Sequence, residues 1–260
     1  MNGKILISTH KEISKYPKTE PYMPVYAGSA ITNKPFQYQR DDENHGGGEI
    51  SSLNPTYLEL TALYWGWKNL KNYDYLGLCH YSKWLTAKRK KRSWPFYQCF
   101  AFSQDKTVKL ALTKEEIEKI LQTHDGIVKK ETKIRTRFMS EPLGRIEAVI
   151  KQKYPEYLSS FYGVIKSQRY STQNIFVMRK RMLDDYLTFM YSFCEEGEKI
   201  YGDKFRPAFA TEHLLSIWLD YHKEYSVKKL YTIASLGEKL NRVWKLIKIR
   251  TRNWKKYFLR

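Results

Sequence analysis

The sequence has 260 residues, 42% of them hydrophobic and 15% aromatic, so it is long and apolar enough for a folded core, which excludes a disordered chain. No apolar run approaches the roughly 18 residues of a membrane-spanning helix, and the mean hydropathy is −0.63. The chain has 46 Lys and Arg residues against 27 Asp and Glu, a formal net charge of +19. This charge predicts an anionic partner: nucleic acid, an anionic membrane or a phosphorylated substrate.

The N-terminus and the cysteines indicate a cytoplasmic protein. The apolar stretch that follows Lys4 is too short for a secretory signal, and a charge precedes it. Cys79, Cys99 and Cys194 are odd in number and lack the spacing of a zinc site, so we expect reduced packing residues.

Short apolar segments and helical periods alternate along the chain, which predicts an α/β sheet domain. The segment 16–40 is rich in Pro, Tyr and Lys and is predicted as irregular loop, and 41–48 as a flexible polar turn. Strands are predicted at 4–9, 74–80, 126–128 and 174–178, and helices at 54–70, 113–123, 146–162 with a break at Pro155, 182–201 and 211–221.

Two of these helices begin with capping signals. Asn54 followed by Pro55 is typical of an N-cap and the first helical position. Thr113 with Glu116 three residues later is typical of a capping box.

The chain ends in a basic amphipathic segment. Residues 238–260 contain nine Lys or Arg and one acid, and Trp244, Ile247 and Phe258 belong to an apolar row at helical spacing. We expect residues 1–232 to form the main domain and 233–260 a helix that attaches to an anionic membrane surface. A terminal helix packed on the domain is the alternative. The sequence contains no RNP motif, KH loop, helix-turn-helix or zinc-finger spacing, so we expect no nucleic-acid partner.

A second basic run, Lys88–Arg92, precedes Pro95 and is predicted as a loop. Two interpretations remain open, a solvated loop and a loop that contacts an anion.

Polar side chains follow two predicted strands, where open α/β sheets bind their ligands. The first strand ends at Thr9 and His10, and the second at His80, followed by Tyr81 and Lys83. His80 is placed to donate to a phosphate or to act as a general base, and also to be an ordinary structural histidine. The sequence has no P-loop, GxGxxG, GxSxG or HExxH motif, which argues against ATPase, dinucleotide-dependent and common hydrolase functions.

Three blocks of sequence stand out: ISSLNP at 50–55, ELTALYWGWKN at 59–69 and DYLGLCHY at 74–81. Together with blocks at 154–157, 174–178 and 212–215, they resemble the DUF4422 family of bacterial capsule and exopolysaccharide glycosyltransferases, over about residues 4 to 222. The basic tail lies outside the resemblance.

The resemblance implies a GT-A-like, single Rossmann-type domain with a mixed, mostly parallel central sheet flanked by helices. It implies an inverting hexosyltransferase that uses a nucleotide-diphosphate sugar, with UDP-galactofuranose one candidate among UDP-hexoses. The implied acceptor is a lipid-linked oligosaccharide of capsule, O-antigen or exopolysaccharide synthesis. The protein would be peripheral at the inner face of the cytoplasmic membrane.

The resemblance also implies site residues. Glu212 matches an acidic position of the family and is expected to be the catalytic base, although a carboxylate at a helix N-terminus is also an ordinary capping preference. His80 is the second expected catalytic residue. Asn54 is equally explained by capping, and Glu59 by an ion pair on its helix. The expected donor-binding residues are Thr9, His10, Ser51, Asn54, Glu59, Tyr81, Lys83 and Asn174.

One departure from the family pattern concerns charge. Where the family has two arginines after the histidine and tyrosine, this chain has Ser82 and Lys83, so a bidentate guanidinium contact to a phosphate is lost. No D-x-D motif follows a predicted strand, so no Mg²⁺ or Mn²⁺ ligands are assigned. Two interpretations remain open: other residues hold a divalent metal, or cations such as Lys83 and the 88–92 loop replace it, which is the interpretation we favour. We expect no tightly bound cofactor. The second hypothesis is a non-catalytic basic module that binds membrane or glycan, and the third is a nucleic-acid-binding protein.

Overall fold

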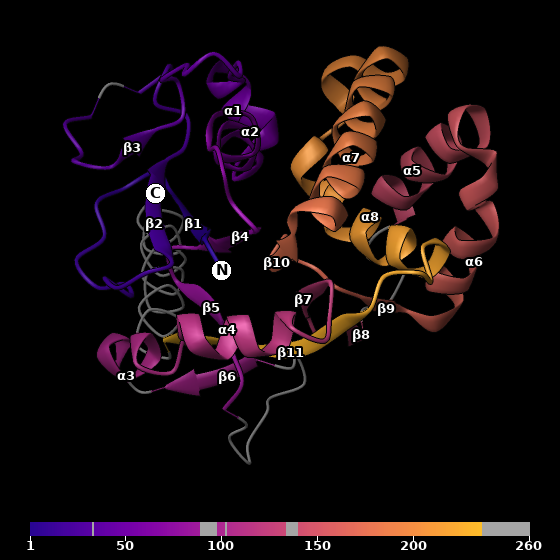
Figure 1. Cartoon of the computed structure of the whole chain (residues 1–260). Coiled ribbons are helices and arrows are strands. Elements are labelled where there is room, and N and C mark those ends of the chain that lie inside the picture. The colour runs from indigo at the N-terminus through magenta and orange to yellow at the C-terminus, as the bar shows by residue number, and fades with distance from the viewer. Residues whose placement is uncertain (33, 89–97, 102, 134–139, 236–260) are drawn as a thin grey trace, which may run out of the picture.

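The computed structural model describes residues 1–32, 34–88, 98–101, 103–133 and 140–235, in which helices flank a mixed β-sheet (Figure 1). The expected α/β class with a mixed sheet is therefore confirmed. Most of the 88–92 loop and most of the 233–260 tail lie outside the described residues. The boundary expected at residue 233 falls inside a strand that continues to Ser235.

The elements of the described residues agree with the predicted strands and helices at most positions. The helices are α1 (Asn54–Tyr57), α2 (Leu60–Asn69), α3 (Gln104–Val108), α4 (Lys114–Leu121), α5 (Ser140–Lys153), α6 (Leu158–Ser167), α7 (Lys180–Tyr201) and α8 (Pro207–Tyr221). Three 3-10 turns are η1 (Ser51–Leu53), η3 (Pro155–Tyr157) and η4 (Gly202–Lys204). The strands are β1 (Gly3–Thr9), β2 (Tyr22–Tyr26), β3 (Gln39–Arg40), β4 (Tyr75–His80), β5 (Lys83–Thr86), β6 (Gln98–Ala101), β7 (Gly126–Lys129), β8 (Thr132–Lys133), β9 (Arg169–Tyr170), β10 (Phe176–Arg179) and β11 (Val227–Ser235).

No helix within these described ranges is long and apolar enough to cross a bilayer.

The main sheet has the strand order β10-β7-β11-β5-β4-β1-β2-β3, and β6 also pairs with β11. Strands β4, β1, β2 and β3 are parallel to their neighbours in that part of the sheet. β10 is antiparallel to both β4 and β7, so β10, β7, β11, β5 and β4 form a closed ring of pairings. Ligands of open α/β sheets usually bind beyond the carboxyl ends of the parallel strands, so this edge of the sheet is the candidate site.

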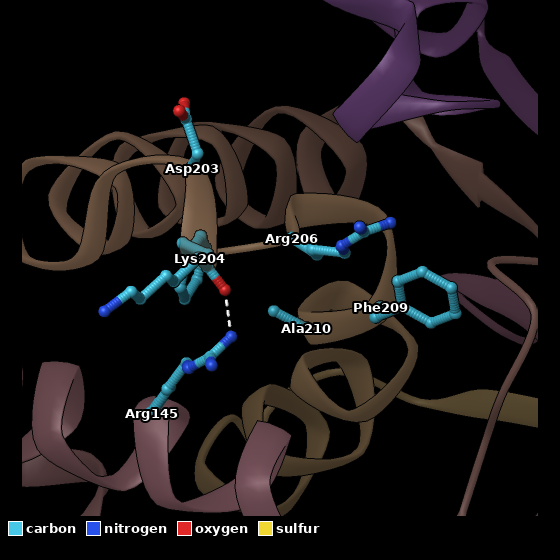
Figure 2. A pocket seen from close by; sticks show the side chains of 7 residues that line it. Arg145, Asp203, Lys204, Arg206, Phe209 and Ala210 are labelled. Atoms are coloured by element: carbon cyan, nitrogen blue, oxygen red, sulfur yellow. Dashed lines mark hydrogen bonds between the residues drawn. The ribbon is translucent and has the colours of Figure 1, made fainter.

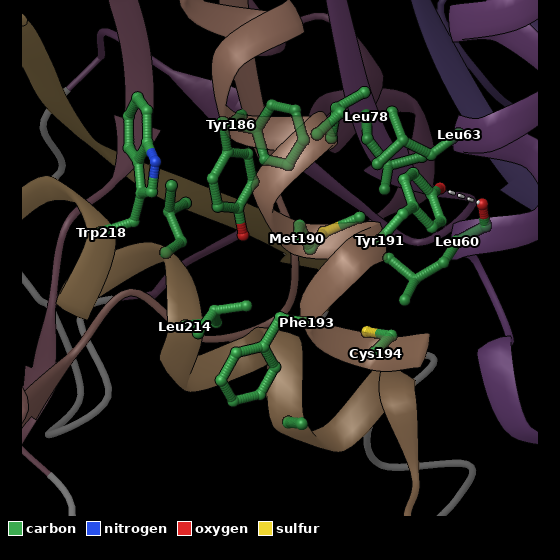
Figure 3. Packing of buried hydrophobic residues seen from close by; sticks show 14 of the residues in the cluster. Leu60, Leu63, Leu78, Tyr186, Met190, Tyr191, Phe193, Cys194, Leu214 and Trp218 are labelled. Carbon is green, nitrogen blue, oxygen red and sulfur yellow. Dashed lines mark hydrogen bonds between the residues drawn. The ribbon is translucent and has the colours of Figure 1, made fainter. Parts of the chain in front are cut away.

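Each face of the sheet packs into its own hydrophobic cluster. Along β1, Leu6 belongs to one cluster while Ile5 and Ile7 belong to the other, as the two-residue period of a strand requires. The larger cluster joins α2, α7 and α8, where Tyr191 also donates a 2.7 Å hydrogen bond to the carbonyl of Leu60 (Figure 3). The smaller cluster packs under α4 through Ile117 and Leu121, whose helix has the predicted capping box.

The helix predicted at 54–70 is wrong in one respect, because the structure breaks it at Leu58. Leu58 has a φ of 49°, and α2 starts at Leu60. The Asn54 side chain does not form an N-cap bond. It donates instead to the carbonyl of Leu58 at 2.8 Å and to Thr61 Oγ1 at 3.1 Å, so it stabilises the break.

The sequence patterns missed seven strands, which are β2, β3, β5, β6, β8, β9 and β11. β2 and β3 lie in the segment predicted as irregular loop, where Pro24 and the many polar residues hide an extended conformation. β5 and β11 were not predicted because β5 is only four residues long and β11 contains Lys228 and Lys229. These two strands obtain their stability from pairing with each other, which a local pattern does not contain.

The segment 41–48 forms turns and bends, as predicted, but its first residue, Asp41, is completely buried. The Asp41 carboxylate accepts hydrogen bonds from the backbone N–H groups of Gly28 and Ser29 at 2.9 and 3.0 Å. It also accepts from the hydroxyls of Ser29 and Ser51 at 2.8 and 2.5 Å. Four donors therefore balance the cost of burying this charge.

The rest of this loop is fixed by α2. Trp65 Nε1 donates to the carbonyl of Glu43 at 2.7 Å, and Asn69 Nδ2 donates to the carbonyl of Gly48 at 2.8 Å. A Cβ atom on Gly47 would lie 2.0 Å from the carbonyl oxygen of Lys68, so only glycine fits there. Trp65 and Asn69 of ELTALYWGWKN are thus explained by this loop, whereas Trp67 of the same motif donates to Asp184 of α7.

We predict that D41A destabilises the protein by about 3 kcal/mol, because the removed carboxylate leaves four buried donors unpaired. Urea unfolding followed by circular dichroism measures this. D105A is the control, since among the described residues the Asp105 side chain makes only an exposed ion pair with Lys15, so the change in stability should be less than about 1 kcal/mol. Equal effects of the two substitutions would contradict the structural role of Asp41.

Candidate functional site

The carboxyl ends of β1 and β4 lie side by side, because Ser8 pairs with His80 in the parallel register. The residues that follow these strands touch one another. The His10 ring packs edge-to-face on Tyr81 with centroids 5.5 Å apart, and Lys11 Nζ lies 4.3 Å from the centre of the Tyr81 ring. This edge of the sheet presents an aromatic ring and cationic groups together.

The loop before β10 connects this edge to the helices. Gln173 and Asn174 have φ angles of 81° and 46°, a left-handed conformation that costs free energy in residues other than glycine. The carbonyl of Gln173 accepts a 2.8 Å hydrogen bond from His80 Nε2. Asn174 Nδ2 donates to Glu59 Oε1 at 2.8 Å and to Thr211 Oγ1 at 3.1 Å. The strained loop therefore brings together residues of β4, α8 and the start of α2.

Glu59 and His80 face each other across this loop. Glu59 is 8% exposed, and its Oε1 lies 4.0 Å from His80 Nε2. Since Nε2 donates to a carbonyl, this nitrogen carries a proton and Nδ1 is the nitrogen left to accept one.

Glu212 lies in the first turns of α8, next to Thr211, and its carboxyl has a strongly raised pKa. Burial raises the pKa of Glu212 to about 7, and the nearby Glu59 carboxylate adds to the increase. Lys83 and Lys129 act in the opposite direction and lower it. A carboxylate with a pKa close to neutral is suited to accept a proton from a hydroxyl.

Lys129 is a second buried ionisable group in the same cluster. Its side chain is 2% exposed at the end of β7, and its Nζ donates to the hydroxyls of Thr132 and Thr172 at 3.1 and 3.0 Å. Burial lowers the pKa of Lys129 to about 8, while Glu212 counteracts the decrease. Lys83 also lowers the pKa of Lys129 by charge repulsion. Glu212, Lys83 and Lys129 therefore lie close enough to interact electrostatically.

The cluster can perform two chemical tasks. Glu212 can accept a proton near neutral pH, and two lysines can neutralise a developing negative charge in a partly desolvated place. The Glu59 carboxylate and the Asn174 amide are polar groups of the kind that orient hydroxyls.

Most of the predicted site residues meet here. Contacts and electrostatic interactions join Glu212, Glu59, His80, Asn174 and Lys83 into one cluster. Thr9, His10 and Tyr81 lie at the adjoining strand ends, with Thr9 Oγ1 bonded to the Lys11 carbonyl at 2.6 Å.

Two predicted donor contacts have other partners. Ser51 is fully buried, donates to Asp41 and accepts from the backbone N–H of Ala30. Asn54 is used in the break between α1 and α2. No contact among the described residues brings either side chain to the cluster.

Sequence reasoning missed Lys129, Thr172 and Thr211. Lys129 directly follows an apolar strand, the same signal that singled out His80, and this signal was available. Thr172 and Thr211 act through contacts with Lys129 and Asn174 that depend on the tertiary structure.

The residues of the cluster do not fit a divalent cation. Across the described ranges no group of three or more His, Cys, Asp or Glu side chains is arranged to hold a metal. Glu212 interacts electrostatically with Glu59, Lys83 and Lys129, and the positive charge of the two lysines disfavours a bound dication.

The sequence profile of DUF4422, described as a domain of unknown function, matches residues 4–225. The chain belongs to the DUF4422 family. A solved structure titled "WbbM bifunctional glycosyltransferase apo structure" superposes with a TM-score of 0.77 at 23% sequence identity. The match covers 91% of this chain and 46% of that chain, so this chain spans about half the length of its neighbour. At this identity the likeness shows a shared fold. The comparison with curated proteins gives no match.

We predict that two substitutions shift the pKa of Glu212 in this DUF4422 chain in opposite directions. E59Q removes a like charge and should lower the pKa below about 7, whereas K129M removes a favourable cation and should raise it. Titration of the Glu212 side-chain carboxyl by ¹³C NMR measures both shifts. E156Q, at an exposed position, should leave the value unchanged. Shifts of the same sign would contradict the arrangement of charges.

A linked prediction concerns stability. The raised pKa of Glu212 means that its ionised form costs free energy in the folded chain, a cost absent below the ordinary value of 4.5 and fully present above about 7. E212Q removes this cost, so we expect the free energy of unfolding to rise by about 1 to 3 kcal/mol at pH 8 and to be unchanged at pH 4. Urea unfolding at the two pH values tests this. Destabilisation by E212Q at pH 8 would refute the buried, unfavourable charge.

Proposed function

We propose that this chain is an inverting glycosyltransferase that moves a hexosyl group from a nucleotide-diphosphate sugar to a hydroxyl of an acceptor. The observation that carries the proposal is the Glu212 carboxyl with a pKa of about 7, placed beside Lys83 and Lys129. The fold shared with the WbbM structure, whose title names a bifunctional glycosyltransferase, supports the reaction class.

The donor is proposed to lie beyond the carboxyl ends of β1 and β4. The Tyr81 ring, with His10 and Lys11 against it, offers a surface for a base or ribose and a positive charge for a phosphate. Lys83 and Lys129 then neutralise the diphosphate as it leaves. In this proposal, Lys129 takes the role in charge neutralisation that the sequence analysis gave to the 88–92 loop, and Lys83 keeps its role.

The chemical step uses Glu212 as the base. Its carboxylate takes the proton of the acceptor hydroxyl, and the oxygen attacks the anomeric carbon. The bond from that carbon to the diphosphate oxygen breaks, and its electron pair remains on the diphosphate. A single displacement of this kind inverts the anomeric configuration. His80, held by the Gln173 carbonyl, and Glu59, held by Asn174, are proposed to orient the hexosyl group.

The acceptor and location are part of the proposal. We propose a lipid-linked oligosaccharide in capsule, O-antigen or exopolysaccharide synthesis, met at the inner face of the cytoplasmic membrane. The net charge of +19 and the basic sequence of residues 238–260 support an anionic membrane surface as a partner. A UDP-hexose, with UDP-galactofuranose as one candidate, is the proposed donor.

Calorimetric titration with UDP, GDP and CMP, each with and without Mg²⁺ or Mn²⁺, is the first experiment. Selective binding of one nucleotide that does not require a metal would agree with the proposal and identify the base of the donor. Equal, weak and salt-sensitive binding of all three would refute it and favour the non-catalytic basic module.

The catalytic assignment predicts a specific loss of turnover. E212Q should lower kcat at least about 100-fold while the Kd for the bound nucleotide changes by less than about twofold, because the base acts only in the chemical step. In the unchanged protein, kcat/KM should fall about tenfold per pH unit below pH 7, where Glu212 becomes protonated. Transfer or hydrolysis of the selected nucleotide sugar measures both.

E156Q is the matched control and should keep full activity. H80A should also reduce turnover without unfolding the chain. Full activity of both E212Q and H80A would refute the assigned site.

A further inference from the structure

The basic residues of the cavity between α5 and the start of α8 do not converge on one point. The cavity has a volume of about 320 Å³, and Arg145, Lys204 and Arg206 belong to its lining. Figure 2 shows the side chains of Lys204 and Arg206 extending in opposite directions, while Arg145 donates to the carbonyl of Lys204. These cations therefore offer no common contact to one anion, in contrast to the buried contacts around Lys129.

The segment 171–174, between β9 and β10, connects the end of β7 to α8. Ser171 Oγ donates to the carbonyl of Lys129 at 2.7 Å, and the backbone N–H of Ser171 donates to Ser216 Oγ of α8 at 2.7 Å. Thr172 Oγ1 accepts from Lys129 Nζ at 3.0 Å. Ser171 and Thr172 are both buried. The end of β7 is therefore fixed relative to the helix that carries the proposed base.

The backbone of Lys129 is held from both sides of Thr172. Its carbonyl accepts from Ser171, and its N–H donates to the carbonyl of Ile175 at 3.2 Å. The threonine side chain is branched at Cβ, which restricts its χ1 rotamers. The Thr172 hydroxyl therefore has a defined position relative to the lysine side chain.

The Lys129 amine is held by neutral oxygens. Nζ donates to the hydroxyls of Thr132 and Thr172, and it makes no ion pair with a carboxylate in the part of the chain that the structure describes. A buried charge without an ion pair depends on its hydrogen bonds, so each hydroxyl favours the protonated amine. At longer range, Glu212 and Glu131 also favour the charged form, whereas Lys83 opposes it.

We propose that Thr172 is a positioning residue of the transfer reaction, whose hydroxyl, together with that of Thr132, keeps the Lys129 amine charged and fixed beside the leaving diphosphate. The inference rests on the proposed function, in which Lys129 neutralises that group. Thr172 acts through the lysine and not by contact with the substrate. A valine at position 172 keeps the shape of the side chain and removes the acceptor, so the amine releases its proton at a lower pH.

The first measurement is the pKa of Lys129, obtained by NMR of the full chain with ¹³C at lysine Cε, with K129M identifying the signal. T172V should lower this pKa from about 8 by about one pH unit, because a hydrogen bond to a charged group changes an equilibrium constant about tenfold or more. T172S keeps a hydroxyl and should leave the pKa at about 8.

Two further variants complete the measurement. T132V removes the other acceptor and should also lower the pKa of Lys129, and it takes the place of T172V if that variant does not fold. T107V is the matched control, because Thr107 of α3 is completely buried and its hydroxyl donates to the carbonyl of Ser103 at 2.9 Å, outside the cluster. It should leave the pKa of Lys129 unchanged.

The pH dependence of turnover separates positioning from packing. With UDP-glucose and UDP-galactofuranose as probes, kcat/KM should fall at high pH as Lys129 loses its proton. This alkaline limb should begin about one pH unit lower in T172V and return in T172S. A hydroxyl needed only for packing would instead lower turnover equally at every pH.

Each outcome decides between the two claims. An unchanged pKa of Lys129 in T172V and T132V, an equal fall in T107V, or an unmoved alkaline limb overturns the role of Thr172. A lowered pKa of Lys129 in a chain that neither transfers nor hydrolyses a nucleotide sugar shows that Thr172 maintains the lysine charge and overturns the proposed function.

Discussion

The hydrogen bonds of the Asn174 amide hold the site together. One side-chain nitrogen reaches Glu59 at the start of α2 and Thr211 on α8, while the preceding residue holds His80 of β4. These contacts offset the left-handed backbone of Gln173 and Asn174. The geometry of the carboxylates and the conformation of the loop therefore depend on each other, and neither is explained alone.

Near this loop, the fold places the carboxylate of Glu59 close to that of Glu212, and Lys83 close to Lys129. Two carboxylates and two lysines interact in a place with limited access to water, and the pKa values of Glu212 and Lys129 move toward neutrality as a result. Such an arrangement destabilises the folded state, and stabilising contacts in other parts of the fold must offset this cost. Here the large cluster joining α2, α7 and α8 and the fully satisfied Asp41 carboxylate stabilise the elements that carry the site.

The sequence patterns predicted the elements that bury an apolar face. They failed where strand pairing or tertiary side-chain contacts determine the local structure. β1, β4, β7 and α7 have clear periodicity and were found, whereas β11 is a strand because β5 and β7 flank it. Glu212, Glu59, His80 and Asn174 were predicted as site residues and are adjacent. Ser51 was grouped with them because it lies in a shared motif, but its contacts with Asp41 depend on tertiary structure. Lys129 was missed since a lysine after a strand is usually solvated.

The closed ring of strand pairings has a consequence for the synthesis of the protein. β11 comes last among the described strands, yet it lies between β5, which carries Lys83, and β7, which ends in Lys129. Until β11 is synthesised, the strands that carry these two lysines are connected only through β4 and β10, on the other side of the ring. Pairing of β11 with both strands is therefore the last step that closes the ring and joins the Lys83 strand directly to the Lys129 strand.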